Sequence, residues 1–384
     1  HRLNQTKPEA LEPDTEFHSE ITRIFHSLRD LHTTYRLPDP FRGMVALLPF
    51  FVEEYWDKDE SRYRYLISKL IKFEGETPEQ TLKGAERLYW NGVPIAQAIA
   101  ANAERQAGNN PDARRVRGLN SLTIRPLGRG LPPDEDWVTI GYRDAQGTLH
   151  EFRQEWLVFM PNLADRGSAF EGIESISNVA VGLDDHTNDI QDAKKVLFSS
   201  KEVKSEASFA PSVQAKRIRN AEDALETCMP TVMRVRIVPV NVRNYGNLRI
   251  FTFNVSNEKE FVEEIGRLLQ EMQDSTELAG VLVDIRGNGG GLIPAAEGVL
   301  RLFTAQRIEP QRAQFINTPL NLRLCELNIE GRYKDALLGR WIESIRNAVQ
   351  TGAIYSLGFP ISEPDFINSI EPVYHGPVAL ITDA

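Results

Sequence analysis

The chain has 384 residues, 41% of them hydrophobic and 26% charged, which is the usage of a globular protein of two or three domains. Its net charge of −10 argues against a nucleic-acid-binding surface, and no apolar run reaches the roughly 18 residues that a membrane-spanning helix needs. Two cysteines, without a CxxC pair or a Cys/His cluster, predict neither a disulfide framework nor a structural zinc site.

The first part of the chain, residues 1–74, is expected to form an N-terminal subdomain of helix and strands. Apolar side chains three or four positions apart over residues 15–31 predict one face of a helix, which Pro38 and Pro40 stop from continuing. Apolar runs over residues 44–52 and 65–73 predict two strands. The apolar positions of the helix are Phe17, Ile21, Ile24, Leu28 and Leu31.

Residues 75–160 are expected to form a second, β-rich module. The stretch GAERLYWNGVPIAQAI predicts a strand over residues 85–90, a tight turn at Asn91-Gly92 and a helix that opens at Pro94. Residues 137–143 and 149–158 predict a hairpin joined through residues 144–147. We therefore expect a compact module with one helix.

Regular signals are few over residues 161–220, which predicts a partly irregular connector, and they return in residues 221–384. Strands alternate with helices there, which indicates a layered α/β domain. The predicted order is two strands around a turn at 243–246, a helix over 257–273, the strand VLVDI, a glycine turn, helices over 293–303 and 336–349, and a strand over 377–382.

The segment from Val281 to Gly291, VLVDIRGNGGG, puts several glycines at a strand-to-helix corner. Glycines can adopt positive φ there and leave backbone N–H groups unshielded, and such donors suit a negative oxygen. From the residues alone, three interpretations stay open: a tight structural turn, a dinucleotide-binding loop and an oxyanion loop. The dinucleotide fingerprint would start at Gly287 and Gly289, but its third glycine position holds Leu292.

The pattern D-x-R-x-N-x-G-G after a buried strand resembles the signature of the tail-specific (C-terminal-processing) serine proteases. This family includes the tricorn-type proteases and chlamydial protease-like activity factor. The resemblance implies that the backbone N–H groups of Gly289 and Gly290 help to hold the oxyanion of an acyl-transfer intermediate. It also implies that the acidic and basic residues of the pattern brace the turn. The matching residues are Asp284, Arg286, Asn288, Gly290 and Gly291.

A histidine, His32, follows the first predicted helix in the sequence LRDLHTT. By itself, a histidine at a helix C-terminus is most often exposed or a partner of the helix dipole. The family carries an Asp-(x)-His-(Thr/Ala) element at this place, which Asp30, His32 and Thr33 match. The resemblance therefore implies that His32 is the general base, which a serine hydroxyl needs before it can act as a nucleophile.

The nucleophile itself is expected outside the chain. The family places its catalytic serine a few residues beyond a Gly-Pro-Val strand, and residues 376–382, GPVALIT, match that strand. No serine of the chain lies in a G-x-S-x-G context. We therefore expect a nucleophilic serine beyond residue 384, and we expect residues 1–384 alone to be inactive towards peptides.

The resemblance also implies a fold, α/β (mixed α+β), with a ClpP/crotonase-like core over residues 221–384. An N-terminal helical subdomain carrying His32 and a PDZ-like insert over residues 75–160 precede the core. Within that insert, residues 117–130 are a distant candidate for a loop that binds the carboxylate of a peptide C-terminus.

The function implied is a serine endopeptidase that acts on polypeptides without a cofactor or a metal ion. No nucleic-acid partner and no stable membrane span are expected, homo-oligomerisation stays open, and an extracytoplasmic or secreted location is favoured over others. An alternative of a different class is a non-catalytic ligand- or peptide-binding protein on the same scaffold, as the interphotoreceptor retinoid-binding proteins are.

Overall fold

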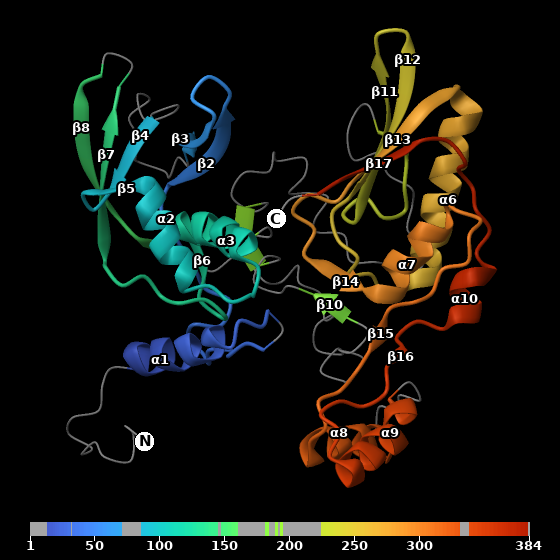
Figure 1. The fold of residues 1–384 in the computed structure, drawn as a ribbon. Coiled ribbons are helices and arrows are strands. Elements are labelled where there is room, and N and C mark those ends of the chain that lie inside the picture. The colour runs from blue at the N-terminus through green and yellow to red at the C-terminus, as the bar shows by residue number, and fades with distance from the viewer. Residues whose placement is uncertain are drawn as a thin grey trace. The chain divides into compact units, whose positions relative to one another are not determined.

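The structure, a computed structural model, describes residues 14–31, 33–70, 86–144, 147–159, 181–183, 189–190, 193–194, 224–330 and 338–382. The chain divides into two compact units, and each combines helices with strands (Figure 1). The first unit comprises residues 1–163, 184–204 and 384, and the second comprises residues 164–183 and 205–383. The predicted mixed α/β class is confirmed.

The described residues of the first unit include two antiparallel sheets and several helices. The strands of the larger sheet are β2 (Phe50–Asp57), β3 (Arg62–Leu70), β4 (Glu86–Trp90), β5 (Val93–Pro94), β7 (Trp137–Arg143) and β8 (Leu149–Glu155). Their order is β2-β3-β4-β7-β8, with β5 paired to β4. The smaller sheet joins β1 (Val45–Leu47), β6 (Ile124–Pro126) and β9 (Leu157–Phe159) in the order β6-β1-β9. The helices are α1 (Asp14–Ser27), α2 (Ile95–Glu104) and α3 (Pro111–Thr123).

The predicted strand, turn and helix around Asn91-Gly92 are confirmed as β4, a turn with positive φ at both residues, and α2. The expectation of a single helix in this module is wrong, because α3 follows α2. The side chain of Asn110 caps α3 by accepting hydrogen bonds from the N–H groups of Asp112 and Ala113, and Pro111 opens it. Of the candidate stretch 117–130, residues 117–126 therefore lie in α3 and β6, and residues 127–130 form the turn that follows.

The apolar run over residues 44–52 is not one strand, because it divides into β1 and β2 at Leu48-Pro49. Pro49 has no N–H to donate to a sheet, and the N–H of Leu48 donates to the carbonyl oxygen of Thr123 at 2.9 Å. The expected domain boundary between residues 74 and 75 falls inside one sheet, since β3 and β4 pair across it at Leu66 and Glu86.

The first helix ends four residues earlier than predicted, and the side chains that it buries are not the predicted apolar ones. It ends at Ser27, and Arg29 takes a positive φ of 57° just beyond its end. Three polar residues one helical turn apart are buried, whereas Ile24 and Leu28 are more than half exposed. The buried polar residues are His18, Thr22 and His26.

The second unit is built on a four-stranded sheet with the order β11-β12-β13-β17. The strands are β11 (Met233–Val240), β12 (Arg243–Ile250), β13 (Leu278–Asp284) and β17 (Val378–Ile381), and β10 (Val181–Leu183) pairs separately with β14 (Gly290–Leu292). The helices α6 (Glu258–Ser275) and α7 (Ile293–Arg301) contribute Phe261, Ile265 and Val299 to the core that covers one face of the sheet (Figure 1).

Strand direction within this sheet changes once. β11 and β12 are antiparallel, while β12, β13 and β17 run parallel to one another. The β11–β12 turn lies at Asn241-Val242 and not at residues 243–246, which are part of β12. Asn241 adopts a φ of 56°, a conformation that asparagine tolerates better than most residues, and this places the turn two residues earlier than predicted.

A smaller part of the second unit follows α7. Its elements are β15 (Arg312–Ala313), α8 (Pro319–Glu330), α9 (Gly339–Thr351), β16 (Phe359–Pro360) and α10 (Pro364–Ser369). The helix predicted over residues 336–349 corresponds to α9, whereas α8 and α10 were not predicted. Trp341 and Cys325 are buried between α8 and α9.

Candidate functional site

The glycine turn, residues 285–292, leads from the end of β13 into α7. Gly287, Gly290 and Gly291 have φ values of 63°, 93° and 146°, which confirms the predicted positive φ in this turn. A Cβ atom at Gly291 would lie 1.9 Å from the carbonyl carbon of Phe253, because the two backbones are in direct contact. The N–H of Phe253 donates to the carbonyl oxygen of Gly290 at 2.9 Å.

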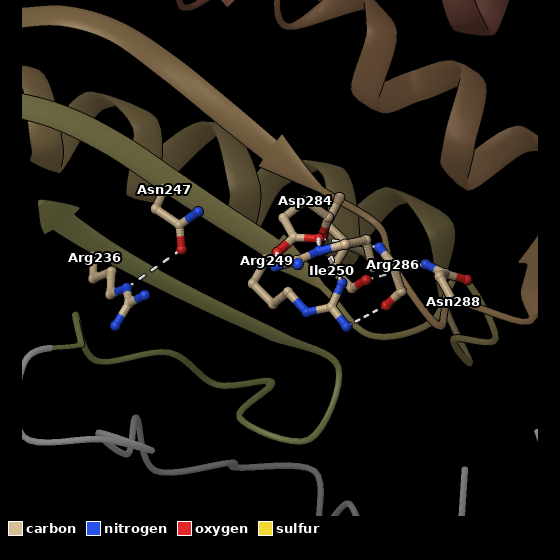
Figure 2. Close-up of polar contacts among 7 residues, drawn as sticks. All are labelled: Arg236, Asn247, Arg249, Ile250, Asp284, Arg286 and Asn288. Atoms are coloured by element: carbon tan, nitrogen blue, oxygen red, sulfur yellow. Dashed lines mark hydrogen bonds and ion pairs between the residues drawn. The ribbon is translucent and has the colours of Figure 1, made fainter. Parts of the chain in front are cut away.

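Asp284, at the end of β13, is 5% exposed and anchors the turn (Figure 2). Arg286 donates to it from its backbone N–H at 3.1 Å, from Nε at 3.0 Å and from Nη2 at 2.7 Å. The hydrogen bonds from Arg286, together with the positive charge of Arg249, hold the pKa of Asp284 at about 2 although burial opposes this. The carboxylate is therefore ionised at neutral pH, which suits a structural anchor and not a proton donor.

Arg249 comes from the neighbouring strand β12 and was not singled out by the sequence. Its Nη1 donates to the carboxylate of Asp284 at 3.0 Å and to the carbonyl oxygen of the same residue at 3.2 Å, and Nη2 donates to the carbonyl oxygen of Arg286 (Figure 2). One guanidinium group thus binds both ends of the strand-to-turn junction. No local pattern in the sequence points to Arg249, because it lies beside Asp284 only through the parallel pairing of β12 with β13.

Asn288 closes the turn with its side chain. Its Nδ2 donates to the carbonyl oxygen of Ile250 at 3.2 Å, and its Oδ1 accepts a hydrogen bond from the N–H of Gly290 at 2.8 Å. Of the two N–H groups that the sequence predicts as oxyanion donors, that of Gly290 is thus engaged in this structure. Gly289 is buried, and its N–H donates to no other residue in the described part of the chain.

The strand β17 ends beside this turn. It runs parallel to β13 with Asp284 opposite Ile381, and the N–H of Ile285 donates to the carbonyl oxygen of Ile381 at 2.9 Å. Parallel neighbouring strands have their carboxyl ends at the same edge of a sheet. The polypeptide that leaves β17 therefore starts next to the polypeptide that forms the glycine turn.

His32, the predicted general base, lies outside the described residues. Its neighbours in sequence are described: the hydroxyl of Thr33 donates to Oδ2 of Asp30 at 2.5 Å. His32 belongs to the first unit and the glycine turn to the second. Its role as a base stays a prediction from the sequence.

The described residues contain no group of three or more His, Cys, Asp or Glu side chains that could hold a metal ion. None of the helices in the described ranges is long and apolar enough to cross a membrane.

Comparison with protein families matches residues 44–165 to the PDZ domain and residues 244–384 to peptidase family S41. The second match includes the glycine turn and so assigns it to a peptidase and not to a dinucleotide-binding domain. Comparison with curated protein sequences finds no significant match.

Three solved structures share the fold at 18% sequence identity. They are mature CPAF (97% of this chain and 70% of that chain, TM-score 0.55), a point mutant of CPAF (99% and 71%, TM-score 0.59) and mature CPAF in complex with lactacystin (97% and 71%, TM-score 0.54). At this identity the likeness concerns the fold. Together with the family matches, it shows a chain in which a region similar to the PDZ domain, residues 44–165, precedes a region similar to peptidase family S41, residues 244–384.

Proposed function

We propose that the protein is a serine endopeptidase that cleaves peptide bonds through an acyl-enzyme, with a nucleophilic serine that follows residue 384. One observation carries this proposal. The carboxyl end of β17 and the glycine turn after β13 lie at the same edge of the sheet, and Ile285 and Ile381 are hydrogen-bonded there. A serine on the segment after β17 is therefore close to backbone N–H groups that can bind an oxyanion.

In this proposal, backbone N–H groups of the glycine turn stabilise the negative charge of the oxyanion. The N–H of Gly289 is the first donor, because no described residue accepts a hydrogen bond from it. The N–H of Gly290 becomes a second donor when the side-chain oxygen of Asn288, now 2.8 Å away, turns aside. An oxyanion bound by two such groups is stabilised by several kcal/mol, since removing one donor from an oxyanion hole costs about 3–4 kcal/mol.

His32 supplies the proton transfer in this proposal. It accepts the proton of the serine hydroxyl as the oxygen attacks the peptide carbonyl carbon, and it returns that proton to the leaving amine. Water then attacks the acyl-enzyme by the same route and releases the second product. The residue that follows His32, Thr33, is hydrogen-bonded through its hydroxyl to the carboxylate of Asp30.

A fluorescent serine-directed phosphonate tests the location of the nucleophile. We expect no labelling of the polypeptide 1–384, and one label per chain in a polypeptide that continues past residue 384 with the sequence of the parent gene. Stoichiometric labelling of residues 1–384 alone would show that the nucleophile lies within them and would overturn the proposal.

The same reagent tests the base. In the extended polypeptide, His32→Ala is expected to slow labelling by about 10³-fold or more, because the hydroxyl loses its proton acceptor. His375→Ala is the matched control, since His375 is an exposed histidine that precedes β17 by three residues. Equal labelling rates for the two variants would remove His32 from the mechanism.

A further inference from the structure

Arg249 holds the start of the glycine turn from the neighbouring strand, β12 (Figure 2). Its side chain is only 23% exposed, and its guanidinium carbon lies 5.2 Å from the centre of the Phe251 ring. An aromatic ring at this distance attracts a guanidinium group. The hydrogen bonds and the ring together give this arginine a defined position.

Two of the acceptors that Arg249 binds are backbone carbonyl oxygens, two residues apart. Nη1 donates to the carbonyl oxygen of Asp284 at 3.2 Å, and Nη2 donates to that of Arg286. The carbonyl group of one residue and the N–H group of the next belong to a single planar peptide unit. Arg249 therefore fixes the orientation of the two peptide units that follow Asp284 and Arg286.

The first of these peptide units also binds the end of β17. Its N–H is that of Ile285, which donates to the carbonyl oxygen of Ile381 at 2.9 Å. Ile381 is the last residue of β17, and the segment after it leads towards the proposed nucleophile. The second peptide unit leads directly into the turn that contains Gly289 and Gly290. One guanidinium group is thus bonded to the peptide unit that holds β17 and to the peptide unit that begins the turn.

Neutralising the charge of Asp284 does not explain these contacts. Arg286 donates three hydrogen bonds to that carboxylate, two of them from its side chain. These hydrogen bonds hold the pKa of Asp284 at about 2 against the effect of burial, and the charge of Arg249 adds to them. What Arg249 contributes beyond a second positive charge is its hold on two backbone carbonyl oxygens.

We propose that Arg249 is a positioning residue of the proposed active site, which sets the place of the oxyanion donors relative to the end of β17. The serine that follows residue 384 and the N–H groups of the turn must meet at one carbonyl group of the substrate. A displacement of about 1 Å between such groups lowers the rate on the order of a hundredfold. This inference rests on the proposed peptidase function, because it needs a nucleophile on the segment after β17.

The planar fork of an arginine side chain suits this role. Its two Nη atoms reach two carbonyl oxygens at once, whereas the ammonium group of lysine is a compact point charge on a flexible stem. Arg249→Lys therefore keeps the charge and loses the fork that holds both carbonyl oxygens. Arg249→Gln loses the charge as well. This pair of variants separates positioning from electrostatic attraction.

The rate of labelling by the serine-directed phosphonate, in the polypeptide that continues past residue 384, tests the proposal. We expect Arg249→Lys to slow labelling about tenfold or more and Arg249→Gln about a hundredfold. Both variants should still reach one label per chain, since a loss of folded molecules would lower the end-point and not the rate. The pH at which labelling is half-maximal should stay the same, because the base is unchanged.

Arg236→Lys and Arg236→Gln are the matched controls. Arg236 lies on β11 of the same sheet, and its Nε donates to Oδ1 of Asn247 at 3.4 Å, apart from the turn (Figure 2). Both control variants should be labelled at the wild-type rate. An Arg249→Lys variant that reacts as fast as the wild type would overturn this inference alone, whatever the rate of Arg249→Gln. A wild type that takes no label would overturn the proposed function and this inference with it.

Amide hydrogen exchange of residues 1–384 is a second measurement, which needs no catalytic activity. Arg249→Lys should speed the exchange of the Ile285 N–H about tenfold or more, because its peptide unit is held less firmly. Arg236→Lys should leave that exchange unchanged. If Arg249→Lys does not reach one label per chain, this exchange decides, and a rate equal to that of the wild type would reject the proposal.

Discussion

Gly291 is the residue of the glycine turn that tolerates replacement least. Its φ of 146° is in the region that favours glycine, and an added Cβ would lie within 2.3 Å of three backbone atoms of Phe253 and Asn254. The two backbones are also joined by a second hydrogen bond, which the N–H of Leu292 donates to the carbonyl oxygen of Phe253 at 2.9 Å. The close approach of two backbones therefore explains the glycine, independently of any contact with substrate.

We expect Gly291→Ala to lower the free energy of unfolding by about 3 kcal/mol or more, since the clash involves backbone on both sides. Gly352→Ala is the control: Gly352 has a φ of 74° at the end of α9 and no atom within 4 Å of the added Cβ, so it should cost only about 1 kcal/mol. Urea unfolding followed by circular dichroism measures both values. Similar losses in the two variants would contradict the role of the Phe253 contact.

The bracing of the turn could be predicted in part from single residues. The resemblance implied that Asp284 and Arg286 brace the turn, and both do so through bonds to each other and to the backbone. Asn288, for which no such role was predicted, also holds the turn by accepting a hydrogen bond from the N–H of Gly290. Arg249 could not be found in this way. It lies 35 positions before Asp284, and only the register between β12 and β13 brings the two together.

At the scale of elements, α1 shows how a correct helix prediction can leave the packing undecided. The periodicity of its apolar residues predicted the helix, yet the buried side is made of His18, Thr22 and His26. The ring of His26 donates from Nδ1 to the carbonyl oxygen of Arg105 at 3.0 Å, and Nδ1 of His18 lies 2.9 Å from the hydroxyl of Tyr35. Hydrogen bonds to backbone carbonyls and neighbouring side chains thus replace the apolar contacts that the pattern suggested.

This packing makes the stability of α1 depend on pH. Burial lowers the pKa of His26 below its usual value of 6.5, and the charge of Arg29 acts in the same direction. The unfolded chain then binds more protons than the folded one as pH falls through 6.5, so the stability contributed by the neutral imidazole is present above that pH and is lost below it. One such group changes stability by at most about 1.4 kcal/mol per pH unit.

We therefore expect the urea midpoint of the wild type to fall between about pH 7 and pH 5, and His26→Gln to reduce this dependence while keeping a side-chain donor. His150→Gln serves as the control because His150 is exposed and pairs with Asp144 at 2.7 Å in a hairpin far from α1 in the sequence. If His26→Gln leaves the pH dependence unchanged, His26 is not the group that titrates.

At the scale of the whole molecule, the sequence by itself determined the mixed α/β class, the order of most of the main helices and strands, and the resemblance of the glycine turn to that of a peptidase, because these depend on local patterns: hydrophobic periodicity, Asn-Gly and proline signals, and the D-x-R-x-N-x-G-G turn. Its errors were local as well: the β11–β12 turn, the end of α1, the division of residues 44–52 into β1 and β2, and the unpredicted helices α3, α8 and α10. The tertiary structure alone decided which face of α1 is buried, that Arg249 holds Asp284, and that β17 ends beside the glycine turn. Each of these depends on pairing between residues far apart in the chain, which no local pattern encodes.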